Sequence, residues 1–199
     1  MVYVMLADGF EEIEALTVVD VLRRADIKVS TVSISNTNIV IGSHSIQVLA
    51  DITITDADLI KADMVVLPGG MPGAENLYNN MELEKAIAGR DVREKWIAAI
   101  CAAPMILGKR GYLRNKEAVC YPGFEKDLYG AIIKNDRVII SENYITSKGP
   151  GTALDFALAI VSVLKNEDTA QKLRTIMQAG DGDRNCIMDL NGYTDINSV

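Results

Sequence analysis

Several residue types that support common mechanisms are scarce in this chain. The 199 residues include one histidine, His44, which excludes any mechanism or metal centre that needs several imidazoles. The three cysteines, Cys101, Cys120 and Cys186, are too widely spaced for a disulfide framework or a zinc site. No apolar run approaches the roughly 20 residues of a membrane span, and the N-terminus lacks a basic region followed by a signal core. We therefore expect a cytoplasmic protein without a metal centre.

Basic side chains are fewer than acidic ones. The chain has 20 Lys and Arg against 27 Asp and Glu, which gives a net charge of −7. Because nucleic acids and anionic membranes are bound through basic patches, neither is expected as the main partner. The chain does have 49% hydrophobic residues, which at this length suffice for the core of one domain.

Strand-like and helix-like segments alternate along the chain. Buried strands are predicted at Met1 to Ala7, Ile27 to Ile34, Met64 to Leu67 and Trp96 to Ile100, and shorter strands near 117–120, 137–140 and 144–147. Helices are predicted at Glu11 to Arg24, 82–95 (charged and exposed), Thr152 to Leu164 and Asp168 to Ala179, and a hairpin at 39–41 and 46–50. Buried strands with helical crossovers indicate a mostly parallel sheet covered on both faces. We expect one α/β domain at 1–179.

The stretch Trp96 to Gly108 places a thiol at a corner. Its first five residues predict a buried strand, and a helix follows from Ala102, with Pro104 near its start. Cys101 therefore lies at a strand-to-helix turn, beside the unpaired N–H groups and the positive dipole end of the helix. Both features lower a thiol pKa and expose a nucleophile. The alternative is that Cys101 is a small buried hydrophobe.

A carboxylate that follows the first strand is a candidate partner for this thiol. Glu14 is in line with the apolar Val18 and Val21, so among Glu11, Glu12 and Glu14 it is the one expected to point inward. A desolvated carboxyl group has a raised pKa and can donate a hydrogen bond to a thiolate or move a proton. Alternatively, all three acids complement the helix N-terminus.

The turn Pro68-Gly69-Gly70 follows the third buried strand. Glycines at such a place let backbone N–H groups approach a ligand as an oxyanion hole requires, although a plain structural turn has the same composition. Ligands bind beyond the carboxyl ends of strands in open parallel sheets. We therefore expect this turn, the acids and Cys101 to meet in space.

The motifs described above occur in the order and with the spacing that a known protein family shows. The stretches ADGFEEIEALTVVDVLRRADIKV, ADMVVLPGGMPGAENL, WIAAICAAPMIL and ITSKGPGTALDFALAIV carry a resemblance that runs from about Val2 to Leu164. On these stretches the chain resembles the ThiJ/PfpI superfamily, and within it the branch of YajL and the parkinsonism-associated deglycase. The resemblance implies a flavodoxin-like (Rossmann-like) three-layer sandwich, related to class I glutamine amidotransferases, with a cysteine nucleophile elbow. It also implies a homodimer, although the first helix and the hairpin look no more apolar than a monomer would allow.

The resemblance also assigns roles to individual residues. It makes Cys101 the reactive thiol and Glu14 its hydrogen-bonding carboxyl partner. The backbone N–H groups of Gly70 and Ala102 become oxyanion donors, and Gly69 belongs to the same substrate-binding turn.

The chain departs from the family pattern at two positions. Tyr121 stands where several branches have a histidine, which argues against a protease-like Cys-His pair; the phenol could orient a substrate oxygen but is a poor general base. Arg24 matches one arginine of the family's anion-binding region near the dimer interface, but the second falls at His44. An imidazole there would weaken the anion site and make it pH-dependent, or it is a simple exposed hairpin histidine. Cys120 could resolve an oxidised Cys101 or be a buried spectator.

The resemblance implies two functions that use the same thiol. In the first, Cys101 and Glu14 convert small reactive carbonyls such as methylglyoxal to hydroxy acids, as a glutathione-independent glyoxalase, or remove their adducts from proteins and nucleotides, as a deglycase. This chemistry needs no metal or organic cofactor. In the second, Cys101 is an oxidation sensor that alters a chaperone-like surface. A role in thiazole monophosphate biosynthesis is implied only by the superfamily name, and no phosphate loop supports it.

The polar segment 180–199 lies outside the resemblance. Asp-x-Asp-x-Asn from Asp181 and Asp-x-Asn from Asp189 are similar to the starts of calcium loops. From Asp181, the sixth position is Cys186 instead of Gly and the twelfth is Gly192 instead of Glu; from Asp189, the chain ends before the twelfth. We expect a weakly ordered extension without a calcium site.

Overall fold

A seven-stranded sheet forms the centre of the molecule. The structure is a computed structural model that describes residues 1–92 and 94–180, so Cys186 and both calcium-like motifs lie outside the described residues. The sheet order is β10-β11-β7-β6-β1-β2-β5, and all neighbours are parallel except β10 and β11. The strands are β1 (Val2–Leu6), β2 (Val29–Ser33), β5 (Ile52–Thr53), β6 (Met64–Leu67), β7 (Trp96–Ile100), β10 (Val138–Ser141) and β11 (Tyr144–Ser147).

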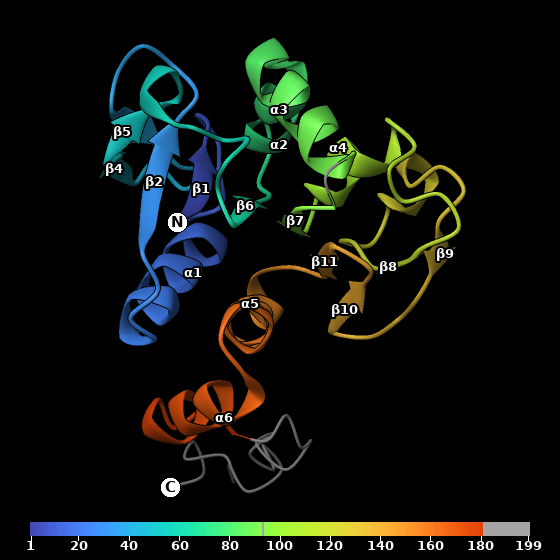
Figure 1. The fold of residues 1–199 in the computed structure, drawn as a ribbon. Helices are drawn as coiled ribbons and strands as arrows, with labels where there is room; N and C mark the ends of the chain where they lie inside the picture. Colours follow the sequence, from blue (N-terminus) through green and yellow to red (C-terminus); the bar gives the residue numbers. More distant parts are fainter. Residues whose placement is uncertain (93, 181–199) are drawn as a thin grey trace, which may run out of the picture.

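Helices cover both faces of this sheet and complete a three-layer sandwich. Figure 1 shows α1 and α5 on one side of the sheet and α2, α3 and α4 on the other, with α6 outside α5. The helices are α1 (Glu12–Arg24), α2 (Gly73–Asn79), α3 (Met81–Asp91), α4 (Pro104–Gly108), α5 (Ala153–Leu164) and α6 (Glu167–Ile176). The predicted flavodoxin-like α/β fold is confirmed. Within the described part of the chain, no helix is long and apolar enough to cross a membrane.

The amphipathic sequence of α1 explains how it positions its first turn. Val18 and Leu22 are fully buried against the core, so this face of the helix lies on the sheet. Glu11 caps the helix, because its Oε2 accepts the backbone N–H of Glu14 at 2.7 Å. Arg23 and Arg24 lie in the last turn, where the macrodipole favours cations.

The predicted hairpin is present, and three short elements were not foreseen: α2, β9 and the edge strand β5. Strands β3 (Ile39–Ile41) and β4 (Gln47–Leu49) pair in antiparallel fashion. Helix α2 begins directly after the glycine-rich turn, so the periodicity of its apolar residues was too short to predict a helix. Beside the elbow, β8 (Glu117–Ala118) pairs with β9 (Ile132–Ile133), a strand too short to show a pattern.

The expectation that the helix at 82–95 is exposed is wrong for one face. Helix α3 buries Leu83, Ile87 and Arg90, and Arg90 is 0% exposed. The Arg90 guanidinium donates to four backbone carbonyls, those of Leu59 and Ala62 at 2.7 and 2.9 Å and those of Asp63 and Trp96 at 3.1 and 2.6 Å. The side chain was predicted to be solvated, but here it ties the loop before β6 to the start of β7.

Candidate active site

Cys101 occupies the predicted corner between β7 and α4. Its φ angle is 65°, an uncommon value for a residue other than glycine, so the backbone turns sharply there. The turn is held from both sides: the Cys101 N–H donates to the Ser147 carbonyl at 2.9 Å, and the Cys101 carbonyl accepts the Tyr121 N–H at 2.8 Å. The side chain is 8% exposed, so the thiol is nearly buried but reaches solvent.

Glu14 lies beside this thiol, at the start of α1. Its side chain is 0% exposed and forms a hydrogen bond with Cys101. Its Oε2 accepts the backbone N–H of Gly69 at 2.8 Å. Desolvation raises the pKa of Glu14 to about 7, although the hydrogen bonds from Cys101 and Gly69 oppose this shift. Glu14 is therefore not a solvated helix-end acid, which was the alternative.

The glycine turn after β6 contributes two different groups. The N–H of Gly69 is used by Glu14, and a Cβ at Gly69 would lie 2.6 Å from the Cys101 Cβ, so only glycine fits between the thiol and the carboxyl group. The N–H groups of Gly70 and Ala102 form hydrogen bonds with the thiol. The N–H of Gly69 thus fixes the carboxyl group, and the N–H of Gly70 points toward the sulfur.

The prediction of a lowered thiol pKa is wrong. Burial, together with the charge and hydrogen bond of Glu14, raises the pKa of Cys101 to about 12, and the N–H groups of Gly70 and Ala102 only partly oppose this. The dipole argument considered the helix end alone and omitted the carboxylate packed against the sulfur. The repulsion exists only while Glu14 is ionised. With pKa values of about 7 for Glu14 and about 12 for Cys101, the pair holds two protons below neutral pH and one above it, and that one proton lies between the sulfur and the Glu14 carboxylate.

Tyr121 is also brought to the thiol. A Cβ on Gly149 would lie 3.2 Å from Cδ2 of Tyr121 and 3.9 Å from Sγ of Cys101, so the ring edge and the sulfur border the same glycine. Tyr121 is 47% exposed, so its side chain is accessible to solvent beside the nearly buried thiol. Cys120 is also buried, and burial raises its pKa to about 12, as it does for Cys101, so a resolving role for Cys120 stays a prediction.

Arg24 and His44 are not brought together into an anion site. Nε of Arg24 lies 2.7 Å from Asp20 on the same helix, and residue 24 is about 15 Å along the axis from residue 14. Nδ1 of His44 lies 2.7 Å from Oε2 of Glu12. Each of these side chains is therefore paired with its own carboxylate. The family pattern did not predict either pair.

The Glu12 carboxylate anchors the hairpin to α1. It accepts the backbone N–H of His44 at 2.8 Å and the Ser43 hydroxyl at 3.2 Å, in addition to the imidazole. Burial would raise the pKa of Glu12, but the bonds from His44 outweigh it and lower this pKa to about 2. One oxygen each of Glu11 and Glu12 and one nitrogen of His44 lie within 4.8 Å of one another, a spacing that could hold a cation. Because both Glu12 oxygens already bind the hairpin, we assign no metal to this cluster.

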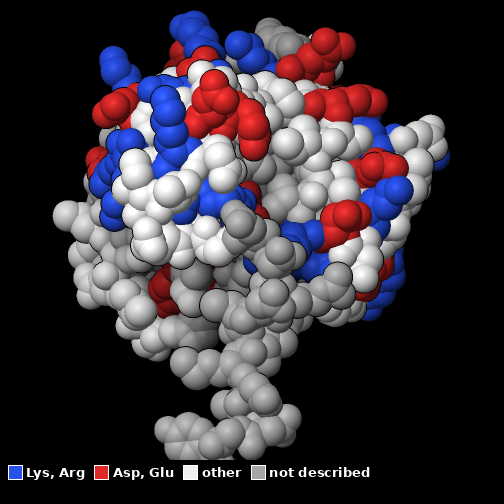
Figure 2. Space-filling model, turned by 90° about the horizontal axis from the view of Figure 1, so that it is seen from below, with Lys and Arg blue, Asp and Glu red and all other residues white. Residues whose placement is uncertain are grey.

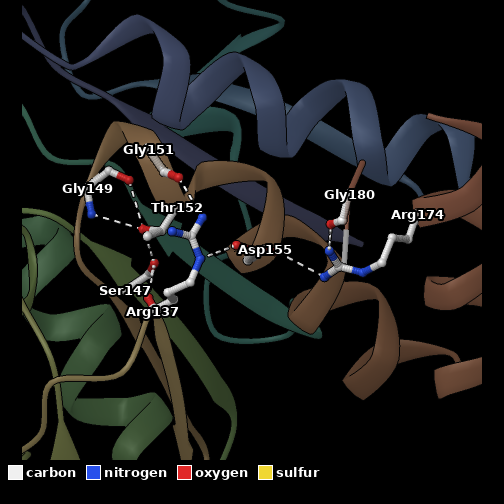
Figure 3. A network of polar contacts seen from close by, with 8 residues as sticks. All are labelled: Arg137, Ser147, Gly149, Gly151, Thr152, Asp155, Arg174 and Gly180. Atoms are coloured by element: carbon white, nitrogen blue, oxygen red, sulfur yellow. Dashed lines mark hydrogen bonds and ion pairs between the residues drawn. The ribbon is translucent and has the colours of Figure 1, made fainter. Parts of the chain in front are cut away.

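A polar network supports the turn that borders the thiol, and sequence reasoning missed it (Figure 3). Arg137 donates to Oδ2 of Asp155 at 2.6 Å and to the carbonyl of Gly151 at 2.7 Å, and Arg174 lies 3.0 Å from Oδ1 of the same aspartate. The Thr152 hydroxyl accepts the N–H of Gly149 at 3.1 Å. The Gly-Pro-Gly-Thr run at the start of α5 was the available signal for a constrained turn.

An exposed apolar surface lies on α1 and the hairpin. It comprises Ile13, Leu16, Ile39, Ile41, Ile46 and Leu49, on α1 and the hairpin, each between 38% and 73% exposed. A neighbouring cavity of about 450 Å³ is lined by Ile13, Leu16, Pro150 and Leu154 among others. These side chains make α1 and the hairpin the candidate surface for association. Charged residues are distributed differently: on the face in Figure 2, basic and acidic side chains intermingle.

Comparison with known proteins agrees with this geometry. The DJ-1/PfpI family matches residues 1–163. Protein DJ-1 homolog B of Arabidopsis thaliana is 36% identical over 194 residues, which is 96% of this chain but 44% of that protein, so the chain spans about half of that relative. Glutathione-independent glyoxalase DJR-1.2 of Caenorhabditis elegans is 32% identical over 164 residues, 82% of this chain and 87% of that one. The structure of oxidized DJ-1 from Toxoplasma gondii, 36% identical, superposes with a TM-score of 0.85 over 89% of this chain and 97% of that one. The chain belongs to the DJ-1/PfpI family.

Proposed function

We propose that the chain is a cysteine-dependent enzyme of reactive-carbonyl detoxification, a glutathione-independent glyoxalase that also removes methylglyoxal adducts from proteins and nucleotides. The observation that carries the proposal is the buried carboxyl group of Glu14 in hydrogen-bond contact with the thiol of Cys101. The C. elegans relative whose name states this glyoxalase activity supports it. In a family member, this pair would place a nucleophile and a proton-transferring group beside the same carbon atom of the substrate.

The reaction begins with addition of sulfur to the aldehyde carbon of methylglyoxal. The proton shared by Cys101 and Glu14 passes to the aldehyde oxygen, which becomes the hydroxyl group of a hemithioacetal. The N–H groups of Gly70 and Ala102, which point at the sulfur, lie close enough to stabilise the oxyanion as it forms. Addition leaves Glu14 ionised beside the C–H bond of the former aldehyde carbon.

Glu14 then acts as the base. Its carboxylate removes the proton from the former aldehyde carbon to give an enediol and returns it to the adjacent carbon, which produces a lactoyl thioester on Cys101. Water hydrolyses the thioester, releasing lactate and restoring the thiol, so the sum is methylglyoxal plus water to lactate. A carboxyl group with a pKa of about 7 accepts and returns a proton equally well near neutral pH.

The deglycase activity would use the same thiol on an adduct. At the hemiaminal carbon of a methylglyoxal adduct, the C–S bond to Cys101 would form as the C–N bond breaks, and the proton of the Cys101–Glu14 pair would go to the leaving amine. The product is the same hemithioacetal, so the proton transfer and thioester hydrolysis that follow are those described above. Tyr121, 47% exposed beside the thiol, is placed to orient a substrate oxygen through its phenol. The half-open position of this ring suits substrates that extend outside the site.

A homodimer and a cytoplasmic location belong to the same proposal. The exposed apolar side chains of α1 and the hairpin, together with the cavity beside Pro150, form a surface of the kind that associates. A second copy of the chain would cover this surface next to the active-site turn. Sedimentation of wild type and of Leu49→Glu tests it, and a monomeric wild type would refute it.

The decisive experiment is lactate production from methylglyoxal without glutathione. We expect turnover in wild type, none in Cys101→Ser, and a loss of at least about a hundredfold in Glu14→Gln. Glu75→Gln, an exposed glutamate on α2, is the matched control and should keep full activity. If wild type forms no more lactate than Cys101→Ser, the glyoxalase proposal is wrong.

One observation favours a second candidate, a redox sensor. The N–H groups of Gly70 and Ala102 and the carboxyl group of Glu14 would all stabilise a sulfinate on Cys101. In this case peroxide would oxidise Cys101 at low equivalents and change the assembly state or chaperone activity without any carbonyl turnover. Intact mass after peroxide treatment, with Glu14→Gln alongside, distinguishes the two candidates.

A further inference from the structure

A cavity of about 620 Å³ lies at the amino-terminal ends of the central strands, whereas the thiol lies at their carboxyl ends. Four parallel strands begin there: Val2 starts β1, Lys28 precedes β2, Asp63 precedes β6 and Trp96 starts β7. The end of α5 closes the cavity. Because Cys101 follows the carboxyl end of β7, the proposed carbonyl chemistry leaves this cavity unused. Its volume falls within the roughly 300–1,000 Å³ typical of small-molecule sites.

One wall of the cavity consists of aromatic and aliphatic side chains that pack against the core. Trp96, the only tryptophan in the chain, is partly buried, and it packs with Ile27, Val163 and Leu164 against the core. The carbonyl of Trp96 accepts a 2.6 Å hydrogen bond from the buried Arg90. This bond fixes the backbone of Trp96, and the partly buried indole, packed against the core, forms the aromatic part of the wall.

Three lysines line the same cavity: Lys28, Lys95 and Lys165. The structure gives none of their side-chain ammonium groups a hydrogen bond or an ion pair within the described residues, whereas the ammonium groups of Lys61 and Lys116 are paired. Unpaired ammonium groups around a concave apolar surface raise the local concentration of anions.

The acids of the cavity do not neutralise these lysines. Asp63 contacts the ammonium group of Met1 and also interacts with Lys95 and Arg90. The cavity lining therefore carries three acids, Asp26, Asp63 and Glu94, against the Met1 ammonium group and three lysines. The buried guanidinium of Arg90 adds a further positive charge behind the wall, since all four of its acceptors are neutral carbonyls. The cavity therefore has a net positive charge.

We propose that this cavity binds a planar organic anion, an aromatic ring that carries a phosphate or a carboxylate. The ring stacks on Trp96, and the anionic group is bound by Lys28, Lys95 and Lys165 through charge-assisted hydrogen bonds. The site is independent of Cys101, so binding here and the proposed carbonyl chemistry stand or fall separately.

Trp96 provides the measurement, because the intrinsic tryptophan fluorescence of the chain comes from this one residue. The full chain is titrated with adenosine 5′-monophosphate, with adenosine as the uncharged analogue and ribose 5-phosphate as the analogue without a ring. We expect saturable quenching by the nucleotide and about tenfold weaker binding of either analogue, the loss that corresponds to one charge-assisted bond or one stacked ring. Cys101→Ser should bind the nucleotide as wild type does.

Variants at the exposed lysines keep the fold intact and localise the effect. Lys28→Ala and Lys165→Ala should each weaken nucleotide binding about threefold to tenfold. Lys172→Ala on α6, outside the cavity, should leave it unchanged. The proposal is overturned if quenching does not saturate at millimolar nucleotide, if adenosine binds as tightly as its monophosphate, or if Lys172→Ala weakens binding as much as Lys28→Ala does.

Discussion

The Oε2 atom of Glu14 accepts the N–H of Gly69 at 2.8 Å, so a backbone group two residues beyond β6 fixes the carboxyl group that faces Cys101. One oxygen is thereby committed to the glycine turn. The other, Oε1, is buried with no hydrogen-bond partner within the described residues. The carboxyl group lies beside the thiol, because Oε2 of Glu14 and the Cβ of Cys101 both border Gly69. The carboxyl group is consequently oriented before any substrate arrives, which is the condition for proton transfer without reorganisation.

This arrangement makes stability depend on pH in a predictable direction. The folded-state pKa of Glu14, about 7, is above its ordinary value of 4.5, so the folded protein holds a proton that the unfolded chain releases. The free energy of unfolding should therefore fall as pH rises from 4.5 through 7, by about 3 kcal/mol in all from this group. Glu14→Gln should remove that part of the decline, which urea unfolding at pH 4.5 and pH 8 would measure. Equal pH slopes for Glu14→Gln and wild type would contradict the assignment.

The central features of the site were accessible from the sequence because they depend on local pattern. The run before Cys101 and the proline after it define a strand end and a helix start, and the alignment of Glu14 with Val18 places that acid on the buried face. These are properties of single elements. The direction of the thiol pKa was not accessible, because it depends on a carboxylate from another element and on the loss of water around both groups.

The sequence also could not predict which carboxylate each surface cation pairs with. Arg24 and His44 were expected near one anion site, but Asp20 lies one helical turn from Arg24 and Glu12 faces the hairpin. Each charge binds the nearest carboxylate, and family position carries no information about which carboxylate that is. The network of Arg137 with Asp155 was missed for the same reason, since it joins two elements by side chains alone.

Gly69 should be intolerant of a side chain. A Cβ there would lie 2.6 Å from the Cys101 Cβ and 2.8 Å from Oε2 of Glu14, so Gly69→Ala must push the thiol and the carboxyl group apart. We expect loss of lactate formation and a destabilisation of about 1–3 kcal/mol, as for other overpacked cores. Gly151→Ala is the control, because a Cβ at Gly151 meets nothing within 4 Å. Full activity in Gly69→Ala would show that the contact between the two groups is dispensable.

The His44 contact should make the hairpin sensitive to pH. The hydrogen bond and charge of Glu12 raise the pKa of His44, so the protonated imidazole is the form that binds the carboxylate. The contact is present below the ordinary histidine pKa near 6.5 and is lost as pH rises through the raised value. Amide hydrogen exchange in β3 and β4, corrected for the intrinsic pH dependence, should accelerate over that range in wild type. His44→Gln should show no such step, and a step of the same size in that variant would assign it to another group.

Arg90 should be the most sensitive charged residue of the fold. Its side chain is 0% exposed, desolvation lowers its pKa to about 10, and four carbonyls depend on it for a donor. Arg90→Met keeps the apolar stem but leaves those carbonyls without their bonds, at a cost of about 3 kcal/mol or more. Lys85→Met, an exposed position on the same helix, should change stability by less than about 0.5 kcal/mol. Urea unfolding of both variants measures the difference, and similar midpoints would mean that water replaces the guanidinium at all four carbonyls.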